Sequence, residues 1–141
     1  MKNDNKALVH RWFEEVWNKG RMDAISEMMS TEAIAHGLTD HAGNELRGAD
    51  GFRAFAENFR KAFPDIRITV EDTVSEGDKI AARCSVQAIH SGDGIGIAAT
   101  NKPMAVTGMT MVRIKDGKIV EAWNNFDFMS LFQQLGVLTI K

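Results

Sequence analysis

The chain has 141 residues, which is enough for one domain with a single substantial core. Its formal net charge of -2 at pH 7 gives no reason to expect nucleic acid or an anionic membrane surface as a partner. No apolar run is long enough to span a bilayer, and the polar N-terminal stretch does not resemble a signal peptide. One cysteine, Cys84, excludes an internal disulfide. We therefore expect a cytoplasmic protein that folds as one domain over residues 1–141.

Helical periodicity dominates the first part of the chain. Apolar side chains recur at helical spacing over residues 5–18, which predicts an amphipathic helix that includes Trp17. Asp23 is expected to cap a short second helix. Four phenylalanines at helical spacing between residues 52 and 63 predict a third helix, which Pro64 ends. Aromatic stripes of this kind usually pack into a core, and we interpret this one in the same way.

The spacing of the apolar residues changes from helical to alternating at Ile66, which marks the start of the strands. The predicted extended segments are 33–37, 66–74, 80–90, 104–114 and 118–126, with loops at 39–47 and 91–103. A last helix is expected to begin near Asp127 and to end at Gly136. Helices, then a mostly antiparallel sheet, then a closing helix define an α+β fold.

Asp116-Gly117 lies between two β-prone runs and predicts a two-residue hairpin turn, because both residues tolerate a positive φ. If this turn closes the hairpin, Ile114 pairs with Ile119 and Val112 pairs with Glu121. Successive side chains alternate between the faces of a sheet. One face is then predicted to carry Ile119, Glu121, Trp123, Asn125 and Asp127. The other face is predicted to carry Val120, Ala122, Asn124 and Phe126, beside Met109 and Met111.

The face that carries Trp123 has the composition of a small-molecule pocket. It is apolar near the turn and then sets two carboxylates and an amide around an indole. We therefore predict that Trp123, Asn125 and Trp17 contact a ligand. Two roles are open for Asp127. Asp directly before an apolar helical run is a favoured N-cap, whereas a carboxylate at the mouth of an apolar pocket can act as a general base or acid.

The histidines have more than one interpretation. His90 ends an alternating strand on its apolar side, where a histidine is more often a core or rim residue than a catalyst. His36, Asp40 and His41 lie close together in sequence but lack tight ligand spacing such as HExxH. We therefore expect no bound metal, and no dinucleotide or nucleophile motif is present that would imply a cofactor.

Four longer segments carry a family pattern. They are KALVHRWFEEVWNKGRMDAISEMM, FRKAFPDIRITVEDTVSEGDKIAAR, IHSG, and TNKPMAVTGMTMVRIKDGKIVEAWNNFDFMSLFQQLG. In this order they resemble the SnoaL-like polyketide cyclases of the nuclear-transport-factor-two-like superfamily, and the resemblance covers nearly the whole chain. The sequence departs from the usual family pattern at Ala99 and Asn101, where members often carry Pro and Gly. This difference concerns the shape of a loop rather than the fold.

The resemblance implies a cone-shaped fold, in which a strongly curved mixed or antiparallel sheet wraps on three N-terminal helices and a short C-terminal helix follows. It also implies ring closure by an intramolecular aldol condensation, with no metal and no cofactor. The segment NNFD places the acid/base residue at Asp127, and IHSG places a pocket-lining histidine at His90. His36 is expected to line the pocket as well.

The sequence thus predicts a cofactor-independent acid/base enzyme, of polyketide-cyclase type, that acts on a small and largely apolar carbonyl compound. Its predicted catalytic residues are Asp127 and His90. The alternative is a non-catalytic binding or sensory module with the same cavity. Water-mediated hydrolysis ranks lowest, because Glu121 would have to supply a second carboxylate and lies far along the strand from Asp127. A simpler role for Glu121 is pairing with Arg113 or another base.

The second face of the hairpin predicts how the protein assembles. It is apolar, and helices that cover the first face would leave it exposed unless a partner covers it. We therefore expect a homodimer that packs through the sheet.

Overall fold

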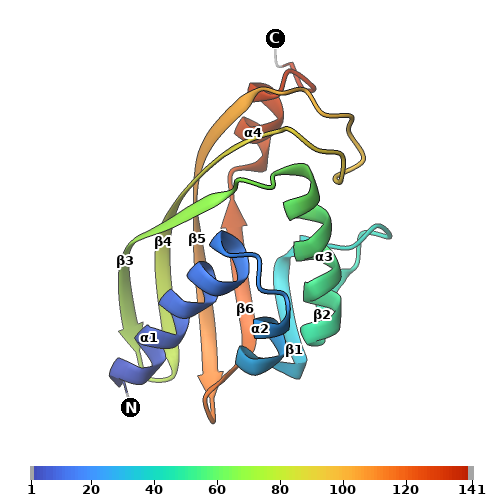
Figure 1. The fold of residues 1–141 in the computed structure, drawn as a ribbon. Helices are drawn as coiled ribbons and strands as arrows, with labels where there is room; N and C mark the ends of the chain where they lie inside the picture. The colour runs from blue at the N-terminus through green and yellow to red at the C-terminus, as the bar shows by residue number, and fades with distance from the viewer. Residues whose placement is uncertain (1, 140–141) are drawn as a thin grey trace.

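The computed structural model describes residues 2–139, which form one sheet together with α-helices and a π-helical segment (Figure 1). The elements are α1 (Lys2–Arg11), η1 (Trp12–Asn18), α2 (Asp23–Met28), β1 (Met29–Thr39), β2 (Glu45–Arg47), α3 (Gly48–Ala62), β3 (Arg67–Glu76), β4 (Lys79–Ile89), β5 (Pro103–Lys115), β6 (Lys118–Phe126) and α4 (Phe128–Gln134). Helices come first, then most of the strands, then a closing helix, so the predicted α+β class is confirmed. Among these residues, no helix combines the length and apolar composition needed to cross a bilayer.

The sheet is mixed rather than wholly antiparallel. Its strand order is β2-β1-β6-β5-β4-β3, and β1 runs parallel to β6 while every other neighbouring pair is antiparallel. Figure 1 shows α1, α2 and α3 on one side of the curved sheet, with α4 at the end of β6. This is the predicted cone, in which the helices bury their apolar sides against the concave face of the sheet.

Strand β1 is much longer than the extended piece predicted at residues 33–37. It covers eleven residues because both of its edges are paired, one with β2 and the other with β6. One of these partners, β6, is near the C-terminal end of the sequence, so the residues around β1 alone could not predict how long the strand is. The predicted first helix differs as well, since it begins at Lys2 and changes from α to π geometry at Trp12.

The β5–β6 hairpin turns where it was predicted to turn. Asp116 and Gly117 have φ values of 52° and 76°, which is the pair of positive angles that a two-residue hairpin turn needs. Ile114 pairs with Ile119 as expected, but the next pair is Arg113 with Glu121. Val120 is therefore an extra residue in β6, a β-bulge, and from this point the predicted register is wrong by one residue.

This bulge exchanges the two faces of β6, because side chains alternate with a period of two. The residues that point toward the helices are Ala122, Asn124 and Phe126, where the first two are 4% and 8% exposed. Trp123 and Asn125 lie on the outer face, where they pair across the sheet with Met111 and Met109. Of the predicted pocket face, Glu121, Trp123 and Asn125 thus lie on the outer side of the sheet, whereas Ile119, before the bulge, is buried in the core.

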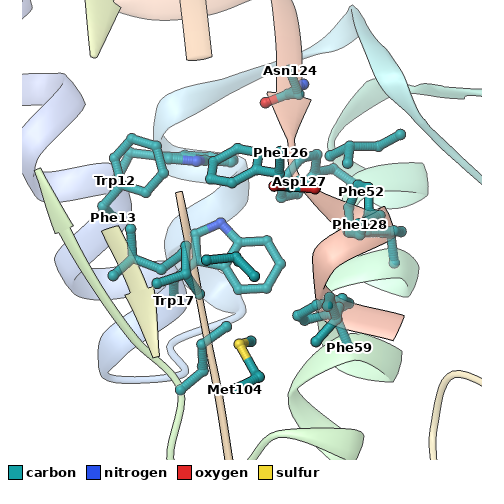
Figure 2. A pocket seen from close by; sticks show the side chains of 17 residues that line it. Trp12, Phe13, Trp17, Phe52, Phe59, Met104, Asn124, Phe126, Asp127 and Phe128 are labelled. Carbon is teal, nitrogen blue, oxygen red and sulfur yellow. The ribbon is translucent and has the colours of Figure 1, made fainter. Parts of the chain in front are cut away.

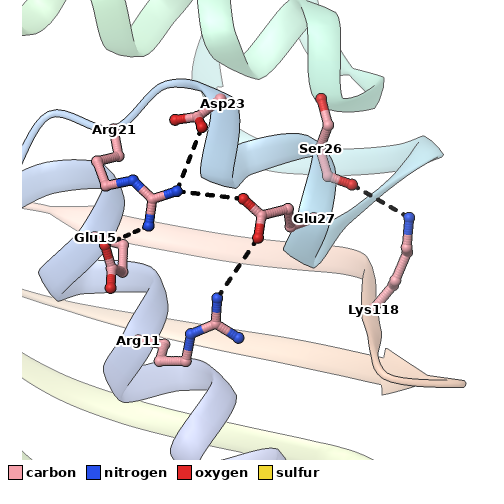
Figure 3. Close-up of polar contacts among 7 residues, drawn as sticks. All are labelled: Arg11, Glu15, Arg21, Asp23, Ser26, Glu27 and Lys118. Carbon is pink, nitrogen blue, oxygen red and sulfur yellow. Dashed lines mark hydrogen bonds and ion pairs between the residues drawn. The ribbon is translucent and has the colours of Figure 1, made fainter.

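A polar network holds α2 against the preceding helix. Arg21 lies at its centre and binds Glu15 at 2.9 Å, Asp23 at 3.3 Å and Glu27 at 3.5 Å (Figure 3). The hydrogen bond from Arg21 lowers the pKa of Glu15. Arg21, Asp23 and Glu27 are solvent-exposed and Glu15 is only partly buried, so we expect the network to orient α2 rather than to stabilise the fold strongly.

Candidate functional site

A cavity of about 60 Å³ lies between the helices and the inner face of the sheet, close to the start of α4 (Figure 2). Eight aromatic side chains line it: Trp12, Phe13, Trp17, Phe52, Phe55, Phe59, Phe126 and Phe128. Its polar lining residues are Asn124 and Asp127. The cavity thus has an apolar wall and two convergent polar groups, which is the usual composition of a small-molecule site.

The aromatic stripe of α3 forms much of this wall. Trp17 contacts Phe52, Phe55 and Phe59 edge to face, with ring centroids 6.1, 6.3 and 5.9 Å apart. Phe52 is buried, while Phe55 and Phe59 are only partly buried and face the cavity. The stripe was predicted to pack into the core, and the structure shows that it also encloses the void. Trp17 lines the cavity, and its contact with a ligand stays a prediction.

Asp127 occupies the position between β6 and α4 and combines the two roles that the sequence left open. It is the N-cap of α4, because its Oδ1 accepts a hydrogen bond of 3.0 Å from the backbone N–H of Ser130. Its second oxygen, Oδ2, makes no hydrogen bond with the part of the chain that the structure describes. Asp127 is exposed and also lines the cavity, so its carboxylate lies at the mouth.

Asn124 is the buried polar group of the cavity wall, and the sequence interpretation missed it. Its Oδ1 accepts a hydrogen bond of 3.1 Å from the Thr110 hydroxyl, and its Nδ2 donates one of 2.9 Å to the carbonyl of His36. Asn124 therefore ties β5, β6 and β1 together. The predicted amide was Asn125, which the bulge turns to the outer face, where it is exposed.

His36 and Trp123 do not line the cavity but meet on the outer face of the sheet. Their rings stack with centroids 5.7 Å apart. His36 Nδ1 lies 2.5 Å from Glu45, and Nε2 lies 2.8 Å from Glu121. Hydrogen bonds to Glu121 and then to Glu45 raise the pKa of His36. Because both ring nitrogens face carboxylates, the protonated form of the imidazole is favoured.

Glu121 completes this outer cluster. Besides His36, it pairs with Arg113 at 3.6 Å, as the sequence predicted. It therefore lies on the opposite side of the sheet from the Asp127 cavity, and the two carboxylates cannot share a water molecule. Within residues 2–139, no three His, Cys, Asp or Glu side chains are arranged to hold a metal ion.

His90 is fully buried, and it lies outside the cavity lining. Its Nδ1 accepts a hydrogen bond of 3.2 Å from the backbone N–H of Thr100 and lies 3.0 Å from the hydroxyl oxygen of the same residue. Its ring packs against Phe63 with centroids 5.2 Å apart. The His90 N–H donates a hydrogen bond to the carbonyl of Lys102, and the His90 carbonyl accepts one from the N–H of Asn101, which closes the base of the loop over residues 91–102. In this geometry His90 anchors a loop, and the predicted catalytic contact would require it to move.

Cys84 behaves as the small buried hydrophobe that the sequence predicted. It is 1% exposed, and burial raises the pKa of its thiol to about 11. A thiol with this pKa is almost wholly protonated at neutral pH and is a poor nucleophile.

The geometry defines a class of protein: a cone-shaped α+β domain with an aromatic-walled cavity and one carboxylate at its mouth. A sequence model described as SnoaL-like polyketide cyclase matches residues 7–135, and the chain belongs to this family. It is 29% identical over 130 residues to aklanonic acid methyl ester cyclase DnrD from Streptomyces peucetius, covering 92% of this chain and 88% of the relative. It is 25% identical to a second aklanonic acid methyl ester cyclase, AcmA from Streptomyces galilaeus, covering 92% of this chain and 89% of that relative.

Solved structures agree with this assignment of the fold. IdmH from Streptomyces antibioticus superposes with a TM-score of 0.80 at 29% identity, covering 94% of this chain and 99% of IdmH. A SnoaL-like protein from Jannaschia sp. CCS1 superposes with a TM-score of 0.85 at 20% identity, covering 97% and 94%. At this lower identity the likeness concerns the fold alone.

Proposed function

We propose that this protein is a cofactor-independent acid/base enzyme that closes a ring in a small, largely apolar carbonyl compound. The observation that carries the proposal is the Asp127 carboxylate, which stands at the mouth of an aromatic-walled cavity with one oxygen unengaged by the described chain. The relatives named as aklanonic acid methyl ester cyclases support the choice of ring closure as the reaction.

In the proposed reaction, Asp127 removes a proton from the carbon next to a carbonyl group, which leaves an enolate. The enolate carbon then forms a carbon–carbon bond to a second carbonyl carbon of the same molecule. The electron pair of that carbonyl moves to its oxygen, and Asp127 returns the proton to the resulting alkoxide. The atoms and electrons balance without any oxidant or reductant.

The enolate oxygen needs a hydrogen-bond donor, since preorganised donors supply a large part of the stabilisation in such reactions. His36 and His90 were predicted to line the pocket, but neither lines the cavity. We assign this role to the wall residues instead. Asn124 has a second amide hydrogen beyond the one it donates to His36, and the indoles of Trp12 and Trp17 each carry one N–H donor.

The substitution Asp127→Asn tests the proposal. Asn is as good an N-cap as Asp, so α4 and the fold should be retained while the base is lost. With aklanonic acid methyl ester as substrate, we expect the rate of product formation to fall roughly 10²–10⁴-fold. Liquid chromatography measures this rate. Asp116→Asn is the matched control, because it removes a carboxylate at a remote turn where Asn also tolerates the positive φ. Equal rates for Asp127→Asn and the unmodified protein would rule out this mechanism.

A binding or sensory module is the second candidate, and the hydrogen bond from Ser130 to Asp127 favours it, because that bond gives the carboxylate a structural role. This candidate predicts saturable binding of aklanonic acid methyl ester without any turnover. Binding measured by calorimetry beside the product assay separates the two functions.

We also infer a homodimer in the cytoplasm. The outer face of β5 carries Met109 and Met111, which are 50% and 40% exposed, and exposed apolar patches on a sheet usually mark an interface. Ala122 and Phe126, which were predicted to belong to this face, lie on the inner side. The cytoplasmic location rests on the single cysteine.

A further inference from the structure

The cavity at Asp127 is too small for the kind of substrate proposed above. Sites for organic ligands usually enclose about 300–1,000 Å³. The cavity of about 60 Å³ thus has room for a few atoms only. A ring-containing substrate must therefore occupy additional space.

Such space exists next to the cavity. A second hollow of about 580 Å³ lies between α3, α4, the loop after β1 and the loop after β4. We call it the outer hollow. Four side chains line both spaces: Leu38, Phe55, Phe59 and Phe128. They form a partition one side chain thick between the cavity and the outer hollow.

Three of the four side chains in the partition, the phenylalanines, are able to move. Phe59 stacks on Phe55 with centroids 5.8 Å apart and meets Phe128 edge to face at 6.4 Å. All three phenylalanines are only partly buried. A phenylalanine ring can change position by rotation about two side-chain bonds, without a change in the backbone.

The far wall of the outer hollow is fixed by close backbone packing. The N–H of Gly92 donates a hydrogen bond of 3.1 Å to the carbonyl of Ala62 at the end of α3. A Cβ at Gly94 would lie 2.3 Å from the carbonyl oxygen of Asn58, so only glycine permits this approach. The loop after β4 is thus seated directly on α3, and its Ile95 lines the outer hollow and packs against the core.

The two spaces differ in polarity. The cavity is aromatic apart from Asn124 and Asp127, whereas the outer hollow includes Thr39, His41 and Asn58 among its lining residues. A ligand that spans both spaces would place its reacting carbonyl groups, within an otherwise apolar part, near Asp127 and further oxygen-bearing groups in the outer hollow.

We propose that the cavity and the outer hollow are two halves of one substrate site, joined when Phe55, Phe59 and Phe128 rotate. The joined site then takes a carbonyl compound larger than the cavity alone admits, with its reacting end at Asp127 and a further oxygen-bearing group beside Asn58. This proposal rests on the proposed function and extends it by assigning the substrate size and the outer subsite.

Isoleucine methyl groups offer a direct test, because Ile66 and Ile68 line the cavity while Ile95 lines the outer hollow. The unmodified protein, labelled at isoleucine methyls, is titrated with prodan, a fluorescent ketone of two fused rings. We expect the signals of all three residues to shift with one dissociation constant. Ile114, which is buried away from both spaces, should not shift. Shifts confined to either space, or no saturable shift, would overturn the proposal.

A matched pair of variants provides the second measurement. Ala54 is exposed on α3 and lines the outer hollow alone, so Ala54→Trp should fill the hollow without touching the cavity. Glu57→Trp places the same side chain at an exposed position of α3 outside both spaces. From prodan fluorescence we expect Ala54→Trp to weaken binding at least about tenfold and Glu57→Trp to change it less than about twofold. Equal affinities for the two variants would contradict the outer subsite.

These measurements are independent of catalysis. Asp127→Asn should show the same methyl shifts with prodan as the unmodified protein, because the site remains while the base is lost. Failure of the outer subsite would appear as missing shifts at Ile95, and failure of the acid/base mechanism would appear as undiminished turnover by Asp127→Asn.

Discussion

The role of Asp127 shows how one side chain can serve structure and chemistry together. One oxygen caps α4 and thereby fixes the direction of the carboxylate, while the other oxygen makes no hydrogen bond with the described chain and the residue lines the cavity. The conflict between cap and base that the sequence suggested is therefore only partial. A carboxylate held by a single backbone N–H keeps lone pairs with which it can accept a proton.

His36 makes stability depend on pH. Its pKa is raised in the folded protein, so its bonds to Glu121 and Glu45 stabilise the fold fully below the ordinary histidine pKa of about 6.5. This contribution is lost as the pH rises through the folded pKa. We therefore expect His36→Gln to lower the melting temperature more at about pH 6 than at about pH 9, as measured by circular dichroism.

The control for this measurement is His41→Gln, which removes an exposed loop histidine. It should lower the melting temperature little at either pH. If His36→Gln lowers the melting temperature by the same amount at both pH values, the ring stabilises the fold by packing on Trp123 and not through its charge.

At the scale of elements, the hairpin illustrates what local sequence can and cannot predict. The turn follows from Asp116 and Gly117, whose own backbone preferences decide it. The bulge at Val120 does not follow, because nothing in the side chain of a valine marks an extra residue. The pairing is shifted by one residue relative to the prediction. As a result, Trp123 and Asn125 lie on the outer face instead of in the predicted pocket, and Asn124 points inward.

The packing of the loop after β4 on α3 gives a prediction at this scale. Gly94→Ala should destabilise the protein by roughly 1–3 kcal/mol, because the added Cβ would overlap the carbonyl oxygen of Asn58 and force the backbone apart. Gly51 lies inside α3 with its nearest atom 3.9 Å from an added Cβ, so Gly51→Ala should stabilise by about 0.5–1 kcal/mol. Urea denaturation measures both. Equal free energies of unfolding for the two variants would show that the loop is not seated as described.

At the scale of the whole molecule, the outer face of the sheet gives a prediction about assembly. Met111→Glu places a charge at the centre of the proposed dimer interface, beside the cluster around Trp123. We expect this variant to be a monomer where the unmodified protein is a dimer, by light scattering after gel filtration. Met129→Glu changes an exposed methionine on α4 and should leave the dimer intact. An unmodified protein whose mass is that of a monomer at all concentrations would refute the interface.

The order of the elements and most of their bounds could be predicted from the sequence, except for β2, which lies within the predicted loop over residues 39–47. The third helix ended before Pro64, the strands after Ile66 lie within one or two residues of the predicted ranges, and Asp127 lies between the last strand and the last helix, as predicted. These features depend on residues close together in the chain. The family resemblance, which the match over residues 7–135 confirmed, uses the same ordered pattern.

The sequence by itself therefore determined the class of fold, the family and the position of the one carboxylate at the start of α4. Tertiary structure alone decided which side of β6 faces the helices, that His36 meets two carboxylates from β2 and β6, and that the aromatic stripe of α3 separates two spaces. The physical reason is the range of the interactions. Turns, caps and periodicity arise from neighbours in the chain, whereas register, burial and cavity walls arise from contacts between segments that only folding brings together.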